Sequence, residues 1–234
     1  MIYLVKTGDF IRIEYTGYDD KGNIFDSTSG EIAKSIHGKE GPLLVIYGTD
    51  RLVSGMEDGL KNMQKGDSKE LQLTSEKAFG SRSRSLVRIM SEKDFYRSEI
   101  RPEVGLAIHL DTDQGRMMGV VKSVSGGRIL VDFNHPLADK SVKYSLKLTE
   151  VIEKTSDKIN TLLDDMDLKA TAKLGEKEEE LTIEVMEKPK DPKDYEQKKQ
   201  YLNAVLKVLF PNIKTVDFKE EDKKAEAKPE NKPV

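Results

Sequence analysis

The most constraining feature of this sequence is a strict two-residue alternation around position 145. The apolar side of the alternation consists of Val142, Tyr144, Leu146 and Leu148, and Lys143, Ser145 and Lys147 stand opposite. A period of two is that of a β-strand, whose successive side chains point to opposite faces. The same alternation occurs between Asp9 and Thr16, with Ile11, Ile13 and Tyr15 on the apolar side. The chain therefore has to build a sheet that buries one face and leaves the other in water.

Turn signals and short periodic runs predict the elements between these two strands. A turn at Asp19–Asn23 makes Ile24–Asp26 the second strand of a hairpin. The polar, glycine-containing stretch from 27 to 42 predicts a long surface loop or an edge bulge. The remaining elements are a strand at Leu43–Tyr47, a helix beginning with the capping-box spacing Ser54-x-x-Glu57 and carrying Met56, Leu60 and Met63, and a strand at Ser68–Thr74.

A different pattern occupies residues 86–136, before the strand that begins near Val142. Short apolar runs at Leu106–Leu110, Met117–Val124 and Arg128–Phe133 are separated by Gln114-Gly115 and Ser125-Gly126-Gly127 turns. Short strands of this kind predict a small all-β insert.

After Ile152 the spacing becomes helical, which predicts a separate small α+β domain over residues 155–218. Ile159, Leu162, Leu163 and Met166 indicate one helix, and Ala170–Leu174 with Leu181–Val185 indicate a hairpin. Asp191-Pro192 starts a second helix with an apolar stripe ending at Pro211, and Ile213–Phe218 predicts a last strand. Residues 219–234 are almost all charged, Ala or Pro, which predicts a disordered tail.

The composition narrows the classes of function. The chain of 234 residues has 39 basic and 42 acidic residues and no cysteine. This charge balance favours no general attraction to nucleic acid or membranes, and the missing cysteines exclude disulfides and thiolate chemistry. No catalytic triad, phosphate-binding loop or metal-ligand cluster stands out, so we expect no cofactor and no metal. No segment has the length of a secretory or membrane-spanning stretch, which predicts a cytoplasmic protein.

Several segments taken together resemble the FKBP family of peptidyl-prolyl cis/trans isomerases, or rotamases. They are Tyr15, Phe25-Asp26, the run Leu52-Val53-Ser54-Gly55-Met56-Glu57, Ala78-Phe79-Gly80 and Tyr144. The resemblance covers residues 6–153 apart from the insert. It implies an α+β fold in which an antiparallel half-barrel sheet wraps around a short helix, with residues 1–85 and 137–154 as the isomerase domain.

The resemblance also implies a shallow apolar pocket for a proline ring. Asp26, Tyr15, Phe79 and Tyr144 are its expected catalytic residues, with Asp26 facing the reacting amide. The expected substrate-binding residues are Phe25, Leu43, Leu52, Val53 and Met56. Val53 would donate its backbone N–H to a substrate carbonyl, and Met56 would form the floor. Phe79 stands where many members have tyrosine and lacks the hydroxyl. The alternative is that these are ordinary core residues of a β-domain.

The segment Asn134-His135-Pro136-Leu137-Ala138 at the end of the insert resembles the N-H-x-L-A segment of bacterial SlyD-type and archaeal long-chain members. In those relatives the insert is a chaperone domain that binds unfolded polypeptide. The implied client-binding side chains are Ile89, Met90, Phe95, Met117 and Met118. The alternative is that Met117 and Met118 fill a small core.

The favoured function is thus a protein-folding isomerase whose partners are unfolded or nascent chains with X-Pro bonds. A holdase chaperone with little isomerase activity is the alternative. A third hypothesis, an RNA- or ribosome-associated factor using Arg82, Arg84, Arg88 and Arg101, lacks an accompanying nucleic-acid motif. The second C-terminal helix is expected either to pack on its own hairpin or to mediate a homodimer.

Overall fold

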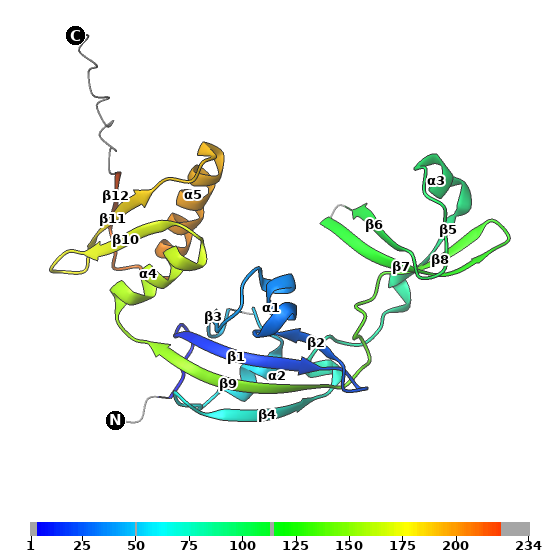
Figure 1. Ribbon diagram of the computed structural model, residues 1–234, viewed down its shortest axis with the longest axis horizontal. Coiled ribbons are helices and arrows are strands. Elements are labelled where there is room, and N and C mark those ends of the chain that lie inside the picture. The colour runs from blue at the N-terminus through cyan, green and yellow to red at the C-terminus, as the bar shows by residue number, and fades with distance from the viewer. Residues whose placement is uncertain (1–3, 50, 113–114, 221–234) are drawn as a thin grey trace, which may run out of the picture.

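The computed structural model describes residues 4–49, 51–112 and 115–220. Its α+β fold contains three sheets, which form three lobes in Figure 1. The first sheet is antiparallel and has the order β2-β1-β9-β4, with β3 paired to β1. Its strands are β1 (Phe10–Tyr18), β2 (Ile24–Ser27), β3 (Leu43–Ile46), β4 (Ser68–Leu73) and β9 (Val142–Ile152). The two alternating strands predicted from the sequence are therefore confirmed as the central pair.

Helix α2 (Ser54–Leu60) covers the apolar face of this sheet. A Cβ atom on Gly59 would lie 2.5 Å from the Leu71 side chain, so the missing side chain is what lets the helix approach β4 so closely. The predicted capping box is wrong, because Val53 is the N-cap and Ser54 is already helical. The Ser54 hydroxyl donates instead to the carbonyl oxygen of Lys77, at 3.4 Å.

The stretch predicted as a surface loop contains a helix, α1 (Gly30–His37). Only Ala33 is buried within it, and the glycines and polar residues around the short helix led the sequence analysis to a loop. Gly38 ends the helix with φ of 73°, a left-handed conformation that favours glycine.

The insert forms a four-stranded antiparallel sheet in the order β5-β8-β7-β6. Two 3-10 turns, Ser75–Lys77 and Arg84–Leu86, precede it, and its strands are β5 (Val87–Ser91), β6 (Ala107–Thr112), β7 (Gly115–Ser125) and β8 (Arg128–Asp132). The prediction of an all-β insert is wrong, because α3 (Glu92–Arg97) follows β5. Phe95 on this helix is 3% exposed and fills the small core that the sheet alone would leave open.

The C-terminal part combines two helices with a third sheet of order β10-β11-β12. Its elements are α4 (Thr155–Asp165), β10 (Lys169–Leu174), β11 (Glu180–Glu187), α5 (Pro192–Leu209) and β12 (Thr215–Glu220). The hairpin predicted over 170–185 is confirmed as β10 and β11, and α5 connects β11 to the parallel strand β12. The Asp191 side chain caps α5 by accepting from the Lys193 N–H at 2.9 Å, as the sequence predicts.

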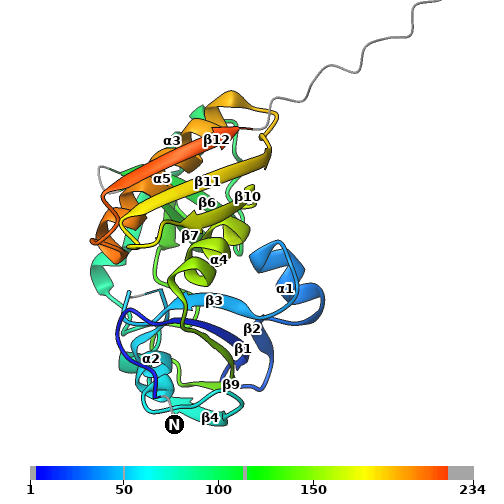
Figure 2. The same ribbon diagram turned by 90° about the vertical axis from the view of Figure 1, so that its left-hand side faces the viewer.

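The apolar core of the C-terminal part continues into the first sheet. Figure 2 shows α4 between that sheet and strands β10–β12. Phe10, Leu44 and Ile46 share one buried cluster with Leu202 and Leu206 of α5. The expectation of a separate C-terminal domain is therefore not confirmed. The apolar side chains of α5 pack against other residues of the same chain.

The end of the chain differs from the prediction by two residues. Lys219 and Glu220, assigned above to a disordered tail, belong to β12. The rest of that predicted tail, residues 221–234, lies outside the described residues. In the part of the chain that the structure describes, no helix combines the length and apolar character that crossing a membrane requires.

Candidate functional site

Four aromatic rings meet on the apolar face of the first sheet. Tyr15 on β1 and Tyr144 on β9 contact edge to face, with ring centroids 6.0 Å apart. Phe25 on β2 packs in the same way on Tyr144 at 5.7 Å and on Phe79 at 5.6 Å. Edge-to-face pairs at these distances are mutually stabilising, so the rings form a continuous wall. The structure thus brings together all four aromatic side chains that the sequence predicts for the site.

A glycine on β1 makes room for this wall. Gly17 lies opposite Tyr144 in the antiparallel register. A Cβ atom built on Gly17 would stand 2.8 Å from the rings of both Phe25 and Tyr144. The two rings can therefore lie over β1 only where that strand carries no side chain.

The site has a buried floor and a half-buried rim. Met56 is 2% exposed, Tyr144 3% and Tyr15 6%. The half-buried side chains packed around them are Phe25, Leu43, Leu52, Val53 and Phe79. Burial therefore decreases from the floor to the rim, where the side chains are partly open to solvent. Val53 caps α2, and no acceptor for its backbone N–H is found among the described residues.

Asp26 lies at the edge of the rings and is held by two side chains. The Tyr15 hydroxyl donates to Asp26 Oδ2 at 2.9 Å, and His37 Nε2 lies 3.0 Å from Asp26 Oδ1. His37 Nε2 is also 3.2 Å from the Tyr15 hydroxyl oxygen. Burial and then the nearby Asp26 charge raise the pKa of Tyr15 far above its ordinary value, so Tyr15 stays a neutral donor. Burial likewise raises the pKa of Tyr144.

His37 is a residue of the site that the sequence analysis missed. It is the last residue of α1, within the segment predicted as a loop. No local signal in the sequence links it to Asp26, because the contact requires α1 to fold back over β2.

A histidine extends the ring wall beyond Phe79. The His135 imidazole stacks on the Phe79 ring with centroids 4.3 Å apart and planes 3° apart. The Leu137 backbone N–H donates to His135 Nδ1 at 3.1 Å. Burial lowers the pKa of His135 below its ordinary value. The N-H-x-L-A segment therefore contributes directly to the edge of the site.

The two chain segments that lead into and out of the insert are bonded to each other beside this histidine. Asn134 Oδ1 accepts from the Ser83 backbone N–H at 2.7 Å, and Asn134 Nδ2 donates to the Ser83 carbonyl at 3.1 Å. An ion pair between Arg82 and Asp132, which is 4% exposed, closes the same junction. These contacts join the two connecting segments to each other at the base of the insert.

The five side chains predicted to bind a client lie in different environments. Ile89 is 67% exposed and Met118 53%. Met90 and Met117 are half-buried against the core of the insert, and Phe95 lies within that core. The expectation that Phe95 presents an exposed apolar surface is therefore wrong. Core packing, the alternative for the methionines, applies to Met117 and not to Met118.

A hollow of about 480 Å³ lies beside Ile89 on the insert sheet. Leu130, which pairs with Ile89 across β5 and β8, also lines it. The remaining lining residues are Ser123, Ser125, Gly126 and Arg128. The insert thus carries an apolar pair within a mostly polar depression on its open face.

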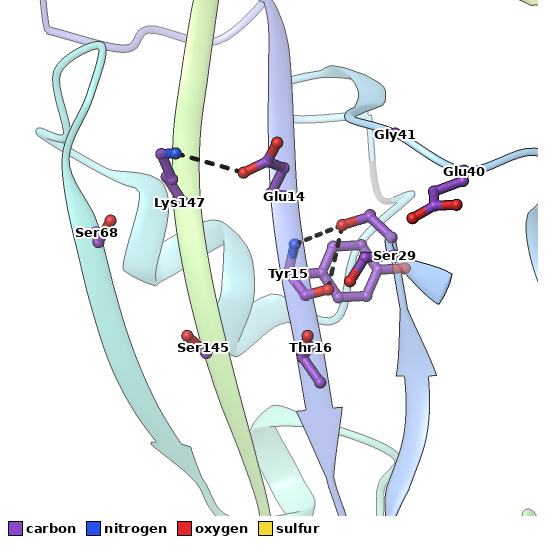
Figure 3. Close-up of a pocket in the computed structure, with 10 residues that line it drawn as sticks. Glu14, Tyr15, Thr16, Ser29, Glu40, Gly41, Ser68, Ser145 and Lys147 are labelled. Carbon is purple, nitrogen blue, oxygen red and sulfur yellow. Dashed lines mark hydrogen bonds and ion pairs between the residues drawn. The ribbon is translucent and has the colours of Figure 1, made fainter. Parts of the chain in front are cut away.

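A second cavity, of about 420 Å³, opens on the opposite face of the first sheet from the rings (Figure 3). Charged and hydroxyl side chains line it, among them Glu14, Lys147 and Ser145. Glu14 and Lys147 form an ion pair across it at 3.5 Å. This polar lining does not suit a proline ring. Within residues 4–49, 51–112 and 115–220, no group of three His, Asp or Glu side chains could hold a metal ion.

Comparisons with known proteins match two parts of the chain. Residues 3–96 match the FKBP-type peptidyl-prolyl cis-trans isomerase family, and residues 88–137 match the family described as FKBP26, IF domain. The chain is 30% identical over 156 residues to the short-type peptidyl-prolyl cis-trans isomerase of Methanocaldococcus jannaschii, covering 64% of this chain and 96% of that protein.

Two bacterial relatives show the same similarity. The FKBP-type 16 kDa peptidyl-prolyl cis-trans isomerase of Escherichia coli is 35% identical over 149 residues, covering 63% of this chain and 93% of that protein. The FKBP-type peptidyl-prolyl cis-trans isomerase SlyD of Aeromonas hydrophila is 31% identical over 149 residues, covering 64% of this chain and 65% of the relative.

Proposed function

Because this chain belongs to the FKBP-type peptidyl-prolyl cis-trans isomerase family, we propose that it catalyses X-Pro isomerisation in unfolded polypeptides that its insert has captured. The observation that carries this proposal is the ring wall over the Met56 floor, with an exposed apolar surface on the adjoining insert. Its substrates are unfolded or nascent chains, and its product is the same chain with the other proline isomer.

The reaction needs a shaped apolar site more than it needs reactive groups. Rotation about an X-Pro bond faces a barrier of about 18–20 kcal/mol and takes on the order of tens of seconds unaided. No covalent bond breaks during rotation. A site accelerates it by binding the twisted amide better than either planar form, and exclusion of water from the carbonyl favours the less polar twisted state.

The side chains of the site have distinct roles in this proposal. Met56 forms the floor under the proline ring, while Tyr15, Phe25, Phe79 and Tyr144 exclude water around it. The Val53 backbone N–H binds a substrate carbonyl. Asp26, with both oxygens held by Tyr15 and His37, faces the amide in a fixed orientation. Leu43 and Leu52 complete the apolar rim.

The insert raises the local concentration of substrate prolines at this site. We assign client binding to Ile89, Leu130 and Met118, because they present apolar atoms to solvent on the sheet of the insert. A client held there keeps its prolines at a high effective concentration near the rings. Weak binding of any single proline is then sufficient for turnover.

This division of labour assigns residues 1–85 with 137–154 to isomerisation and 86–136 to client binding. Residues 155–218 pack against the first unit through α4 and α5. The test is to replace residues 86–136 by a short glycine-serine linker. Isomerisation of a short X-Pro peptide should persist, while acceleration of proline-limited refolding should fall sharply. Equal loss of both activities would refute the proposal.

A holdase with little isomerase activity is the second candidate. The observation that favours it is the apolar nature of Met56 and Phe79, which offer a proline peptide no hydrogen-bond donor. Such a protein suppresses aggregation but leaves peptide isomerisation at its uncatalysed rate. Comparing wild type with Asp26→Ala and Tyr144→Ala in a peptide assay separates the two candidates.

A further inference from the structure

We propose that His135 binds the substrate, donating a hydrogen bond from its Nε2–H to a backbone carbonyl oxygen next to the proline. This inference rests on the proposed isomerisation at the ring wall. On the Phe79 side of the site the wall is made of hydrocarbon rings, so His135 is the side chain there that brings an N–H group.

The hydrogen bond at Nδ1 determines the tautomer of His135. The Leu137 backbone N–H is a donor, so Nδ1 has to accept and carries no proton in the neutral ring. The proton of the neutral imidazole then resides on Nε2. In the described part of the chain, Nε2 has no protein acceptor. The site therefore holds a donor that is left for another molecule.

The environment keeps His135 neutral near pH 7. One face of the imidazole lies on the Phe79 ring at a centroid distance of 4.3 Å, and burial lowers its pKa. A neutral N–H donor costs less to desolvate than an imidazolium when an apolar proline ring arrives. His135, exposed at the rim, thus offers an uncharged donor to an arriving substrate.

The backbone around His135 fixes its position before any substrate arrives. Asn134, on one side, is bonded twice to Ser83 and once to Asp132, through its own backbone N–H at 3.0 Å. Leu137, on the other side, is 9% exposed and packs in the core of the first sheet. Because both neighbours are anchored, little conformational entropy is lost when His135 binds a ligand.

The decisive variant is His135→Phe, which retains a flat ring on Phe79 and removes the N–H. For a short X-Pro peptide we expect a fall in kcat/KM of about tenfold, the usual effect of losing one good hydrogen bond. Peptide affinity, measured by titration without turnover, should weaken in parallel. His135→Gln retains an N–H donor, so it should lose much less peptide affinity and activity than His135→Phe.

A second substitution tests the donor role directly. Phe79→Tyr adds a hydroxyl to the same wall, so in the His135→Phe background it should recover at least about a third of the lost affinity. In the wild-type background it should change affinity little. If Phe79→Tyr restores peptide affinity in the His135→Phe background but not in wild type, the group that was lost is a donor. A damaged fold would not regain affinity from a hydroxyl at position 79.

The outcomes separate this inference from the proposed function. Unchanged peptide affinity in His135→Phe overturns the inference, and so does an equal loss in His135→Gln. If His135→Phe fails to fold, as judged by circular dichroism, then the comparison of His135→Gln with His135→Ala decides, because only the former keeps a donor. A wild-type protein that binds the peptide without isomerising it refutes the proposed function and leaves this inference testable by affinity.

Discussion

His37 Nε2 lies 3.0 Å from Asp26 Oδ1, which links the last residue of helix α1 to the acidic residue of the ring wall. Tyr15 occupies the other carboxylate oxygen, at 2.9 Å. Asp26 therefore has one fixed orientation, and the helix outside the half-barrel takes part in setting it.

Removing His37 should release Asp26 and slow isomerisation. One hydrogen bond typically contributes about 0.5–1.5 kcal/mol, so we expect His37→Ala to lower kcat/KM for an X-Pro peptide by roughly two- to twelvefold. His37→Gln retains an N–H donor and should lose less. Lys34→Ala, on the same helix and paired with exposed Glu31, is the matched control. Equal activity of His37→Ala and the control would contradict a positioning role.

Adding one methyl group at Gly17 should disrupt the ring wall. A Cβ atom there stands 2.8 Å from Phe25 and Tyr144, so Gly17→Ala must push both rings aside. We expect about 1–3 kcal/mol of destabilisation by overpacking and a marked loss of peptide isomerisation. Chemical denaturation and the peptide assay measure the two effects. Glu14→Ala, on the outer face of the same strand, should change neither strongly, because its ion pair with Lys147 is exposed.

Client binding and folding of the insert should respond to different apolar residues. Ile89→Ser and Met118→Ser alter exposed side chains and should weaken suppression of aggregation while the melting temperature stays near that of wild type. Phe95→Ala leaves a cavity in the core of the insert and should destabilise the insert by about 3–5 kcal/mol. If Ile89→Ser and Met118→Ser left aggregation suppression intact, the client surface would have to lie elsewhere.

Protonation of His135 should lower the stability of the protein in mild acid. Burial lowers the pKa of this histidine in the folded state, so the unfolded chain binds more protons near and below the ordinary histidine pKa of about 6.5. Stability therefore decreases as the pH falls through that value, until the folded histidine is protonated as well. Thermal midpoints between pH 8 and pH 5 should decline less for His135→Gln than for wild type. Parallel curves for the two proteins would show that His135 does not contribute.

Several elements could be predicted from the sequence because their signals are local. The alternation from Val142 to Leu148 predicted the strand β9, and Asp191-Pro192 predicted the start of α5. The eight aromatic and apolar residues predicted for the ring wall, floor and rim do fall in one cluster of the structure, and Asp26 lies at its edge. The order of these motifs along the chain resembles that of a known family, and this resemblance was enough to predict that the residues share one site.

Other features depend on contacts that local patterns do not encode. Phe95 reads as one more apolar residue, and only the packing of α3 on β5 makes it core. The helical stripe of α5 predicted an apolar partner, but not that Phe10 and Ile46 of the first sheet would share its cluster.

By itself the sequence determined where most of the strands and the helices α2, α4 and α5 form, since the hydrophobic period acts over a few neighbours. Only the tertiary structure decided that His37 meets Asp26, and that His135 covers Phe79 from across the insert. Such contacts depend on ångström-scale placement of segments far apart in the chain. That placement results from packing the whole molecule, which no single segment specifies.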